Sequence, residues 1–331
     1  MRACLLLVAA LAFSSAAAAQ TAPVPRTPDG HPDFQGVWST KWRTPLERPK
    51  EADGAAVIPA ERAPALVAAL DAGIRAMGNL SPDVDFDWGP FLPAAGGGVR
   101  TSLIVEPVDG KRPLTEAARD LAKIVKAASD RAEGPEARGP SERCVRGSGA
   151  TPFTIAPGNQ NRRIVQTPAS MVIATEDIGD VRIIDINGRS RPDALQTWTG
   201  DSIARWDGDD LAIETHLLLR EAATPPSAAD QAPRTVVERL HFNSPNEIDY
   251  SYTVEDTATY TTPMKVNFLM RRTDEPMYEV ACHEGNYSLG GILSGARAEE
   301  ARTARQVAGG NVSLEKQKRR PHKEAGVSSG N

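Results

Sequence analysis

The residues best suited to acid–base chemistry lie together near the C-terminus, in the segment Tyr278–Arg297. An alternation of apolar residues there leads into His283 and Glu284, which a Gly-Asn turn follows at once. An imidazole titrates close to neutral pH, and a nearby carboxylate orients the ring and raises its basicity. We therefore expect His283 to act as a general base, oriented by Glu284 or by Asp201.

Residues that could hold a substrate at this base come from several parts of the chain. Arg143, Arg182 and Arg205 could bind anionic charge, and Tyr287 could contact the rest of the molecule. We expect proton transfer without a cofactor, by a lyase, isomerase or hydrolase, on a small and partly apolar organic molecule. Two alternatives stay open. One is a carrier that binds such a molecule without chemistry, and the other is a purely structural role for Tyr278–Arg297 as a folding staple.

Sequence patterns typical of metal and nucleotide sites do not occur. His216, His241 and His283 could form a metal site only if three strands brought them together, and the chain has no HxH or HExxH pattern. The glycine run Gly96–Gly98 is not followed by the Lys-Ser or Lys-Thr pair of a phosphate-binding loop. We therefore expect neither a metal nor an organic cofactor.

The N-terminus has the features of a cleaved signal peptide. Arg2 precedes the apolar run Leu5–Phe13, and Ala17–Ala19 fits a cleavage site with the cut between Ala19 and Gln20. The run is shorter than the ~20 residues that a membrane-spanning helix needs. We expect a periplasmic or secreted protein without a membrane span. Its net charge of −5 argues against a nucleic-acid partner.

Removal of the signal peptide leaves two cysteines, Cys144 and Cys282. An even pair in an exported protein predicts a disulfide, although two buried thiols are the alternative. The bond would close a long loop and would hold His283 close to Arg143.

Beyond Arg162 the chain alternates between short runs of strand-like residues and turn signals. Short strands at regular spacing favour an antiparallel barrel or a lipocalin-like meander, whose hollow could hold a small ligand. Strand alternation places Arg239 and His241 on one face and Glu238 on the other. The predicted strands cover 162–166, 171–176, 181–185, 196–198, 203–206, 211–219, 236–242, 248–254, 264–271 and 278–283.

The region before these strands is expected to be irregular and to carry two short helices. Apolar residues at spacings of three and four predict a helix over Glu61–Met77, and Thr115 can cap a second helix that runs to about Ala128. Val37, Trp38 and Trp42 should dock the N-terminal arm, Thr27–Trp42, on the core. We therefore divide the chain into a signal peptide (1–19), an irregular region (20–160), a β domain (161–297) and a charged, largely disordered tail (298–331).

Several motifs of the chain resemble those of a large family of exported proteins from Gram-negative bacteria, common in sphingomonads and acidobacteria. The resemblance covers nearly the whole mature chain and implies a periplasmic or secreted location. The family has no established activity, so the resemblance assigns no catalytic residue. The motifs are PDGHPDFQGVW (28–38), TPLERP (44–49), SERC (141–144), GDS (200–202), RWDGD (205–209) and ACHEGNY (281–287).

Overall fold

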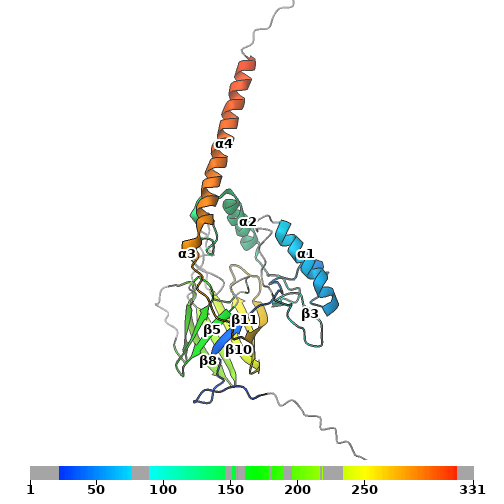
Figure 1. Cartoon of the computed structure of the whole chain (residues 1–331), viewed down its shortest axis with the longest axis vertical. Coiled ribbons are helices and arrows are strands. Elements are labelled where there is room, and N and C mark those ends of the chain that lie inside the picture. The colour runs from blue at the N-terminus through cyan, green and yellow to red at the C-terminus, as the bar shows by residue number, and fades with distance from the viewer. Residues whose placement is uncertain are drawn as a thin grey trace, which may run out of the picture.

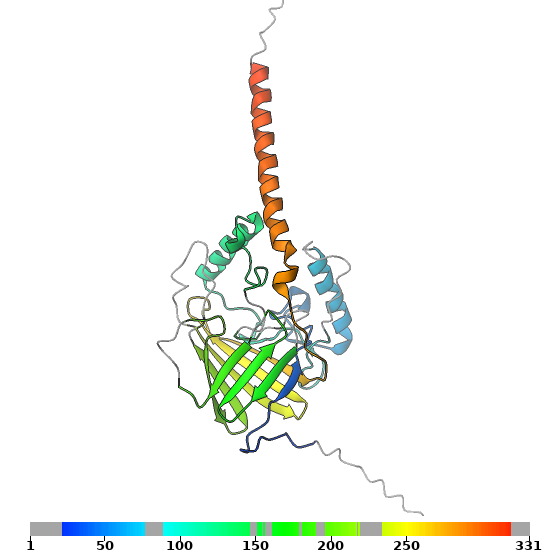
Figure 2. The same ribbon diagram turned by 60° about the vertical axis from the view of Figure 1, so that its left-hand side comes forward.

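The computed structural model describes residues 22–76, 89–145, 151–153, 155, 161–178, 181–189, 196–216, 218 and 234–318. Ten strands form one sheet in the order β1-β5-β6-β7-β8-β9-β10-β11-β12-β4. The pairing of β1 (Gly36–Ser39) with β12 (Met264–Arg272) closes nine of them into a barrel, to which β4 (Ile104–Glu106) adds through β12 (Figures 1 and 2). The predicted mainly β barrel is confirmed.

Neighbouring strands of the barrel pair antiparallel, as predicted, with one exception. Strands β7 and β8 pair in parallel, and a parallel pair requires a crossover connection. The strand predicted over 196–198 is reduced to a bridge from Thr197 to Leu218. The strands between β4 and β12 are β5 (Asn161–Gln166), β6 (Ser170–Thr175), β7 (Val181–Ile186), β8 (Asp201–Asp207), β9 (Asp210–His216), β10 (Thr235–Ser244) and β11 (Glu247–Glu255).

Both N-terminal helices form where the sequence predicts them, as α1 (Ala63–Ala76) and α2 (Glu116–Arg131). Thr115 caps α2, because its hydroxyl accepts a hydrogen bond from the amide of Ala118 at 3.1 Å. Shorter elements of this region are 3₁₀ turns at Lys50–Ala52, Ala60–Arg62 and Pro135–Ala137 and a two-stranded sheet of β2 (Val57–Ile58) and β3 (Val99–Arg100).

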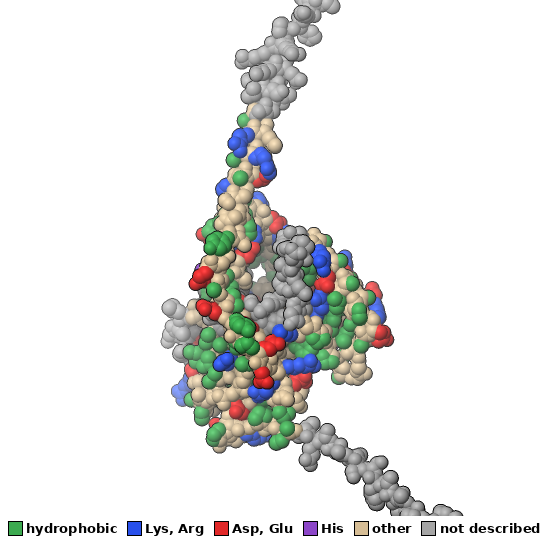
Figure 3. Space-filling view, viewed as in Figure 1, with side chains coloured by type: hydrophobic (Ala, Val, Ile, Leu, Met, Phe, Trp, Pro, Cys, Tyr) green, Lys and Arg blue, Asp and Glu red, His purple; other side chains and the backbone are tan. Residues whose placement is uncertain are grey.

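The C-terminal part differs from the prediction in two ways. The strand predicted over 278–283 is wrong, because the chain from Tyr278 is irregular and then forms the short helix α3 (Cys282–Gly285). The tail predicted to be disordered from residue 298 instead continues α4 (Tyr287–Lys318), while residues 319–331 lie outside the described part. Figure 3 shows α4 standing clear of the body with side chains of both charges along it.

The helices of the described ranges include none with both the length and the apolar character needed to cross a membrane.

The barrel interior is filled by the alternate side chains of its strands. In β11, Ile248, Tyr250, Tyr252 and Val254 all point inward and are almost completely buried. The same alternation puts Glu238 inside the barrel and Arg239 and His241 outside it, which confirms that they lie on opposite faces of β10, as predicted. Apolar side chains dominate this core, so burial of their surface is the main source of stability.

The N-terminal arm closes the barrel end opposite α4 (Figures 1 and 2). Phe34 is fully buried and stacks on Phe242, with ring centroids 4.6 Å apart. His31 stacks on Trp206 at 4.3 Å, and the side chain of Gln166 accepts a hydrogen bond from the Phe34 amide. The predicted docking of the arm is confirmed.

Strands of the N-terminal region are also part of the barrel wall. β1 and β4 pair with the same strand, β12, near its opposite ends, and β1 bridges β12 to β5. The barrel therefore cannot close without residues 36–39, and the predicted boundary at 160/161 does not separate two folding units.

Candidate functional site

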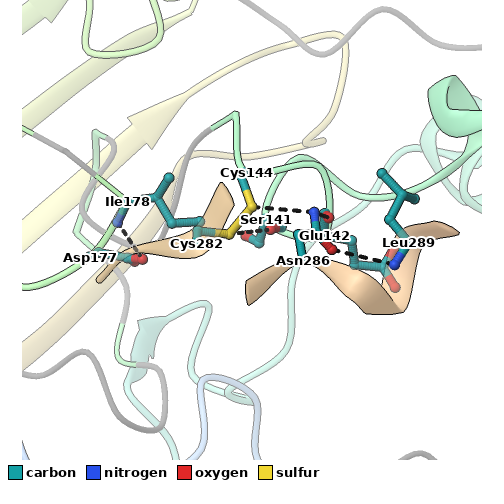
Figure 4. The surroundings of a disulfide bond; sticks show 8 residues. All are labelled: Ser141, Glu142, Cys144, Asp177, Ile178, Cys282, Asn286 and Leu289. Atoms are coloured by element: carbon teal, nitrogen blue, oxygen red, sulfur yellow. Dashed lines mark hydrogen bonds between the residues drawn. A yellow bond between two sulfur atoms is a disulfide. The ribbon is translucent and has the colours of Figure 1, made fainter. Parts of the chain in front are cut away.

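The predicted disulfide between Cys144 and Cys282 is present, with Cα atoms 5.7 Å apart and a sequence separation of 138. Figure 4 shows the bond beside Asn286, whose side-chain amide donates to the carbonyl of Glu142 at 2.8 Å. Arg297 of α4 adds a hydrogen bond to the carbonyl of Ala132 at 3.1 Å. These contacts hold α3 and the first turns of α4 against the segment that follows α2.

The predicted catalytic residues of this segment do not face the barrel interior. His283 and Glu284 are exposed on α3, and Tyr287 is 83% exposed at the start of α4. Within the described residues the His283 imidazole has no hydrogen-bond partner. The strand predicted to carry His283 is instead a helical turn that begins at the disulfide cysteine Cys282, so strand alternation does not set the direction of the imidazole.

The remaining predicted site residues are distributed over different surfaces. Asp201 is buried at the start of β8, whereas Arg205 is exposed on the outer face of the same strand and donates to the carbonyl of Gly188 at 3.3 Å. Arg143 is half-buried beside the disulfide. Only Arg182 lies in the barrel interior, so the structure does not bring these residues together.

Arg182 is occupied by an ion pair inside the barrel. Its guanidinium donates to both carboxylate oxygens of Glu238, at 2.9 and 2.7 Å, and to the hydroxyls of Ser202 and Thr215 at 3.2 Å. The Tyr250 hydroxyl donates to the same carboxylate at 2.5 Å. Both terminal nitrogens of Arg182 therefore donate to groups of the protein itself, which does not support the predicted role of Arg182 in binding an anionic substrate.

Burial and charge act in opposite directions on this cluster. Burial alone would lower the pKa of Arg182, but the adjacent Glu238 carboxylate outweighs it, so the net shift is upward. Burial, followed by the charge of Glu238, raises the pKa of Tyr250 well above its usual value. Both groups therefore stay protonated, and the cluster is a fixed ion pair rather than a proton donor. Alternation predicts that Glu238 lies on the face opposite Arg239 and His241, but it does not predict the partner of Glu238 on β7.

One pocket lined by described residues lies outside the barrel, along α2. This α2 groove has a volume of about 640 Å³. Its apolar floor comes from Leu114, Leu121 and Val125 together with the alanines of the same helix face. Its far wall is the segment from Glu136 to Glu142, just before the disulfide.

A second hollow, the wall trench, runs along the outer face of β10, β11 and β12. Two adjoining pockets of about 470 Å³ each form it, and they share Val105, Asp249 and Asn267. His241 and Arg239 line it, and they share one face of β10, as strand alternation predicts. No group of acidic, cysteine and histidine side chains in the described ranges could hold a metal ion. Sequence reasoning missed the trench, because its floor joins strands far apart in the chain.

Comparisons with protein-family models, with curated proteins and with solved structures found no match. The roles of the α2 groove and the wall trench therefore follow from their geometry alone.

Proposed function

We propose that the protein is an exported small-molecule-binding protein whose ligand lies in the α2 groove. The observation that carries the proposal is the uncovered apolar face of α2. Among the residues of this helix, all of which are described, only Ala128 is buried. Leu121 and Val125 instead face a hollow of about 640 Å³. Pockets for small ligands usually measure ~300–1,000 Å³ and are mostly apolar.

The lining of the groove indicates the kind of ligand. Its floor is apolar, while Arg112, Lys126 and Arg138 stand at its edge with Glu136 and Glu142. Such a lining suits a molecule with an apolar body and one polar or acidic group. The sequence predicts the same kind of partly apolar molecule, but it places the ligand at His283 rather than in the α2 groove.

The walls of the groove are held in position without a ligand. Arg138 donates to the carbonyl of Ser129, at the end of α2, at 2.7 Å and pairs with Glu142 at 2.5 Å. Arg297 and the disulfide tie both wall segments to α3 and α4. A preformed site loses less conformational entropy on binding, which favours affinity.

Export is part of the proposal. A disulfide is typical of oxidising compartments outside the cytosol, and the chain has one. The signal peptide predicted over residues 1–19 lies outside the described residues.

Binding without chemistry is favoured over the proton-transfer enzyme centred on His283. A general base must come within hydrogen-bond reach of its substrate in a site that holds it. The described contacts of α3 give His283 neither an enclosing pocket nor a carboxylate partner.

A matched pair of substitutions on α2 tests the proposal. Val125 lines the groove and is 42% exposed, whereas Ile124 does not line it and is 48% exposed. Both side chains are accessible, so a charge at either position should leave the fold intact. The probe is 8-anilinonaphthalene-1-sulfonate, an aromatic anion whose fluorescence reports binding.

We expect Val125→Glu to weaken binding of this probe by about tenfold or more, which corresponds to ~1.4 kcal/mol. Ile124→Glu should leave the Kd within about twofold of the wild-type value, a change of ~0.4 kcal/mol. Equal effects of the two substitutions, or no saturable binding by the wild-type protein, would refute the α2 groove as the ligand site.

A further inference from the structure

The wall trench contains a carboxylate that holds an imidazole and a guanidinium together. Asp210 of β9 binds Nδ1 of His241 through one oxygen at 2.6 Å and Nη1 of Arg239 through the other at 2.8 Å. Asp207 binds the same Nη1 at 3.0 Å. His241 and Arg239 lie two residues apart in β10, so both side chains point to the same face. Asp210 therefore fixes the orientation of both cationic side chains.

The nitrogen atoms of His241 and Arg239 that these contacts leave without a hydrogen bond face the trench. Among the described residues no hydrogen-bond partner occupies Nε2 of His241 or Nε and Nη2 of Arg239. The two side chains are 52% and 45% exposed, so a small molecule can reach them. An imidazole held at Nδ1 by a carboxylate and open at Nε2 is the arrangement of a general base.

The opposite side of the trench carries fixed polar groups. Asp249 lies directly across from His241 in the β10–β11 pairing, and its carboxylate accepts a hydrogen bond from Asn267. Arg100 donates to the other side of the Asn267 amide at 2.7 Å, and burial lowers the pKa of Arg100. These contacts hold the carboxylate of Asp249 and the guanidinium of Arg100 in position on the side of the trench across from His241.

We propose that the wall trench is a hydrolytic site for small polar esters. His241 accepts a proton at Nε2 from a water molecule, whose oxygen forms a bond to the ester carbonyl carbon. The resulting oxyanion lies against the free N–H groups of Arg239. The bond to the alcohol oxygen then breaks, the imidazolium returns its proton to that oxygen, and an acid and an alcohol leave. Asp210 is a positioning residue that holds Nδ1–H throughout.

A second imidazole–carboxylate pair in the same barrel provides a control. His216 lies 2.6 Å from Glu214, a distance equal to that between His241 and Asp210. Both of these residues belong to β9, and neither lines the wall trench. Among the described residues Glu214 pairs with no arginine, so His216 shares only the imidazole–carboxylate contact with His241 and lies outside the wall trench.

The test measures hydrolysis of p-nitrophenyl acetate by the full-length protein. The wild-type protein should be faster than free imidazole at equal concentration. His241→Gln should reduce the rate by about a hundredfold, the lower end of what a positioned base supplies. Asp210→Asn should lower kcat and leave KM unchanged, while His216→Gln should stay within about twofold of the wild type, ~0.4 kcal/mol.

His241 is exposed and Asp210 and His216 are half-buried, and thermal unfolding of each variant checks that the fold is kept. A wild-type protein no faster than free imidazole would overturn the proposal, as would equal losses in His241→Gln and His216→Gln. Ile124→Glu lies outside both the wall trench and the α2 groove and should leave this hydrolysis unchanged. The probe-binding test of the α2 groove uses other residues, so this site and the proposed ligand site can fail independently.

Discussion

The ion pair of Arg182 and Glu238 is the clearest case of a charged pair placed inside the barrel. Both side chains are almost completely buried, so their desolvation opposes folding. Bidentate geometry and the hydroxyl of Tyr250 offset this loss. The pair joins β7 to β10 across the interior, and it therefore favours one arrangement of the strands over others.

Removing one partner of this pair should lower the free energy of unfolding more than removing both partners. Glu238→Gln leaves the guanidinium buried without its counter-charge and should lower the free energy of unfolding by ~3–5 kcal/mol. The double substitution Arg182→Met with Glu238→Leu should lower it less. Urea denaturation measures both. The exposed Arg205→Met is the control and should change stability by less than ~0.5 kcal/mol. An equal loss in the single and double variants would contradict this account of the pair.

Acid should weaken the contacts of Asp210. Burial alone would raise the pKa of Asp210, but hydrogen bonds from His241 and Arg239 outweigh it, so the net shift is downward. The linked stability is therefore present above the unfolded pKa of about 3.9 and is lost as the pH falls through the lower folded value. Asp210→Asn should reduce the loss of unfolding free energy between pH 6 and pH 2.5. An unchanged pH dependence in urea denaturation would contradict this linkage.

At the scale of elements, local sequence patterns predict which segments form helices and which residues of a strand share a face. The alternation in β10 gives the correct face for Glu238 and His241, and the spacing of apolar residues gives α1 and α2. The strand predicted over 278–283 fails for a non-local reason. The amide of Tyr278 bonds the side chain of Glu176 rather than a neighbouring strand, and the disulfide fixes the chain just beyond it.

The site is less predictable than the strands, because strand partners decide which side chains meet. Asp210 and His241 lie on different strands, and their contact depends on the β9–β10 pairing, in which Leu211 is opposite Leu240. Sequence alone gives the face of each residue but not this register. The pairing of Cys144 with Cys282 was predictable because removal of the predicted signal peptide would leave no other cysteine.

Loss of the disulfide should destabilise the protein and release α3. A sequence separation of 138 residues corresponds to about 5 kcal/mol of loop entropy in the unfolded chain. Cys144→Ala with Cys282→Ala should therefore lower the free energy of unfolding by an amount of this order. Amide hydrogen exchange should increase in α3 and at the start of α4, while β10 and β11 stay protected under native conditions. Faster exchange in the barrel strands alone would contradict this division.

At the scale of the molecule, the N-terminal arm is what completes the barrel. β1 bridges β5 and β12, and Phe34 fills the end of the interior beneath it. Without the arm, β5 and β12 would both present open edges, which promote aggregation. Neither the closing strand nor the plug is visible in the periodicity of residues 20–40, because the four residues of β1 are too few to show a pattern.

Phe34→Ala should lower the free energy of unfolding by ~3–5 kcal/mol, because the fully buried ring would leave a cavity at the barrel end. The neighbouring Gln35→Ala is the control, since that side chain is exposed and should contribute less than ~0.5 kcal/mol. Thermal and urea denaturation measure both changes. Similar stabilities for the two variants would mean that the arm only covers the barrel and does not complete its core.

The most direct test of the binding account is a map of amide chemical shifts during titration with 8-anilinonaphthalene-1-sulfonate. We expect the largest saturable changes in α2 and in the wall segment from Glu136 to Glu142. Strands β10 and β11, which line the wall trench, should change little. Saturable changes centred on the barrel strands, with α2 unaffected, would contradict the placement of the ligand in the α2 groove.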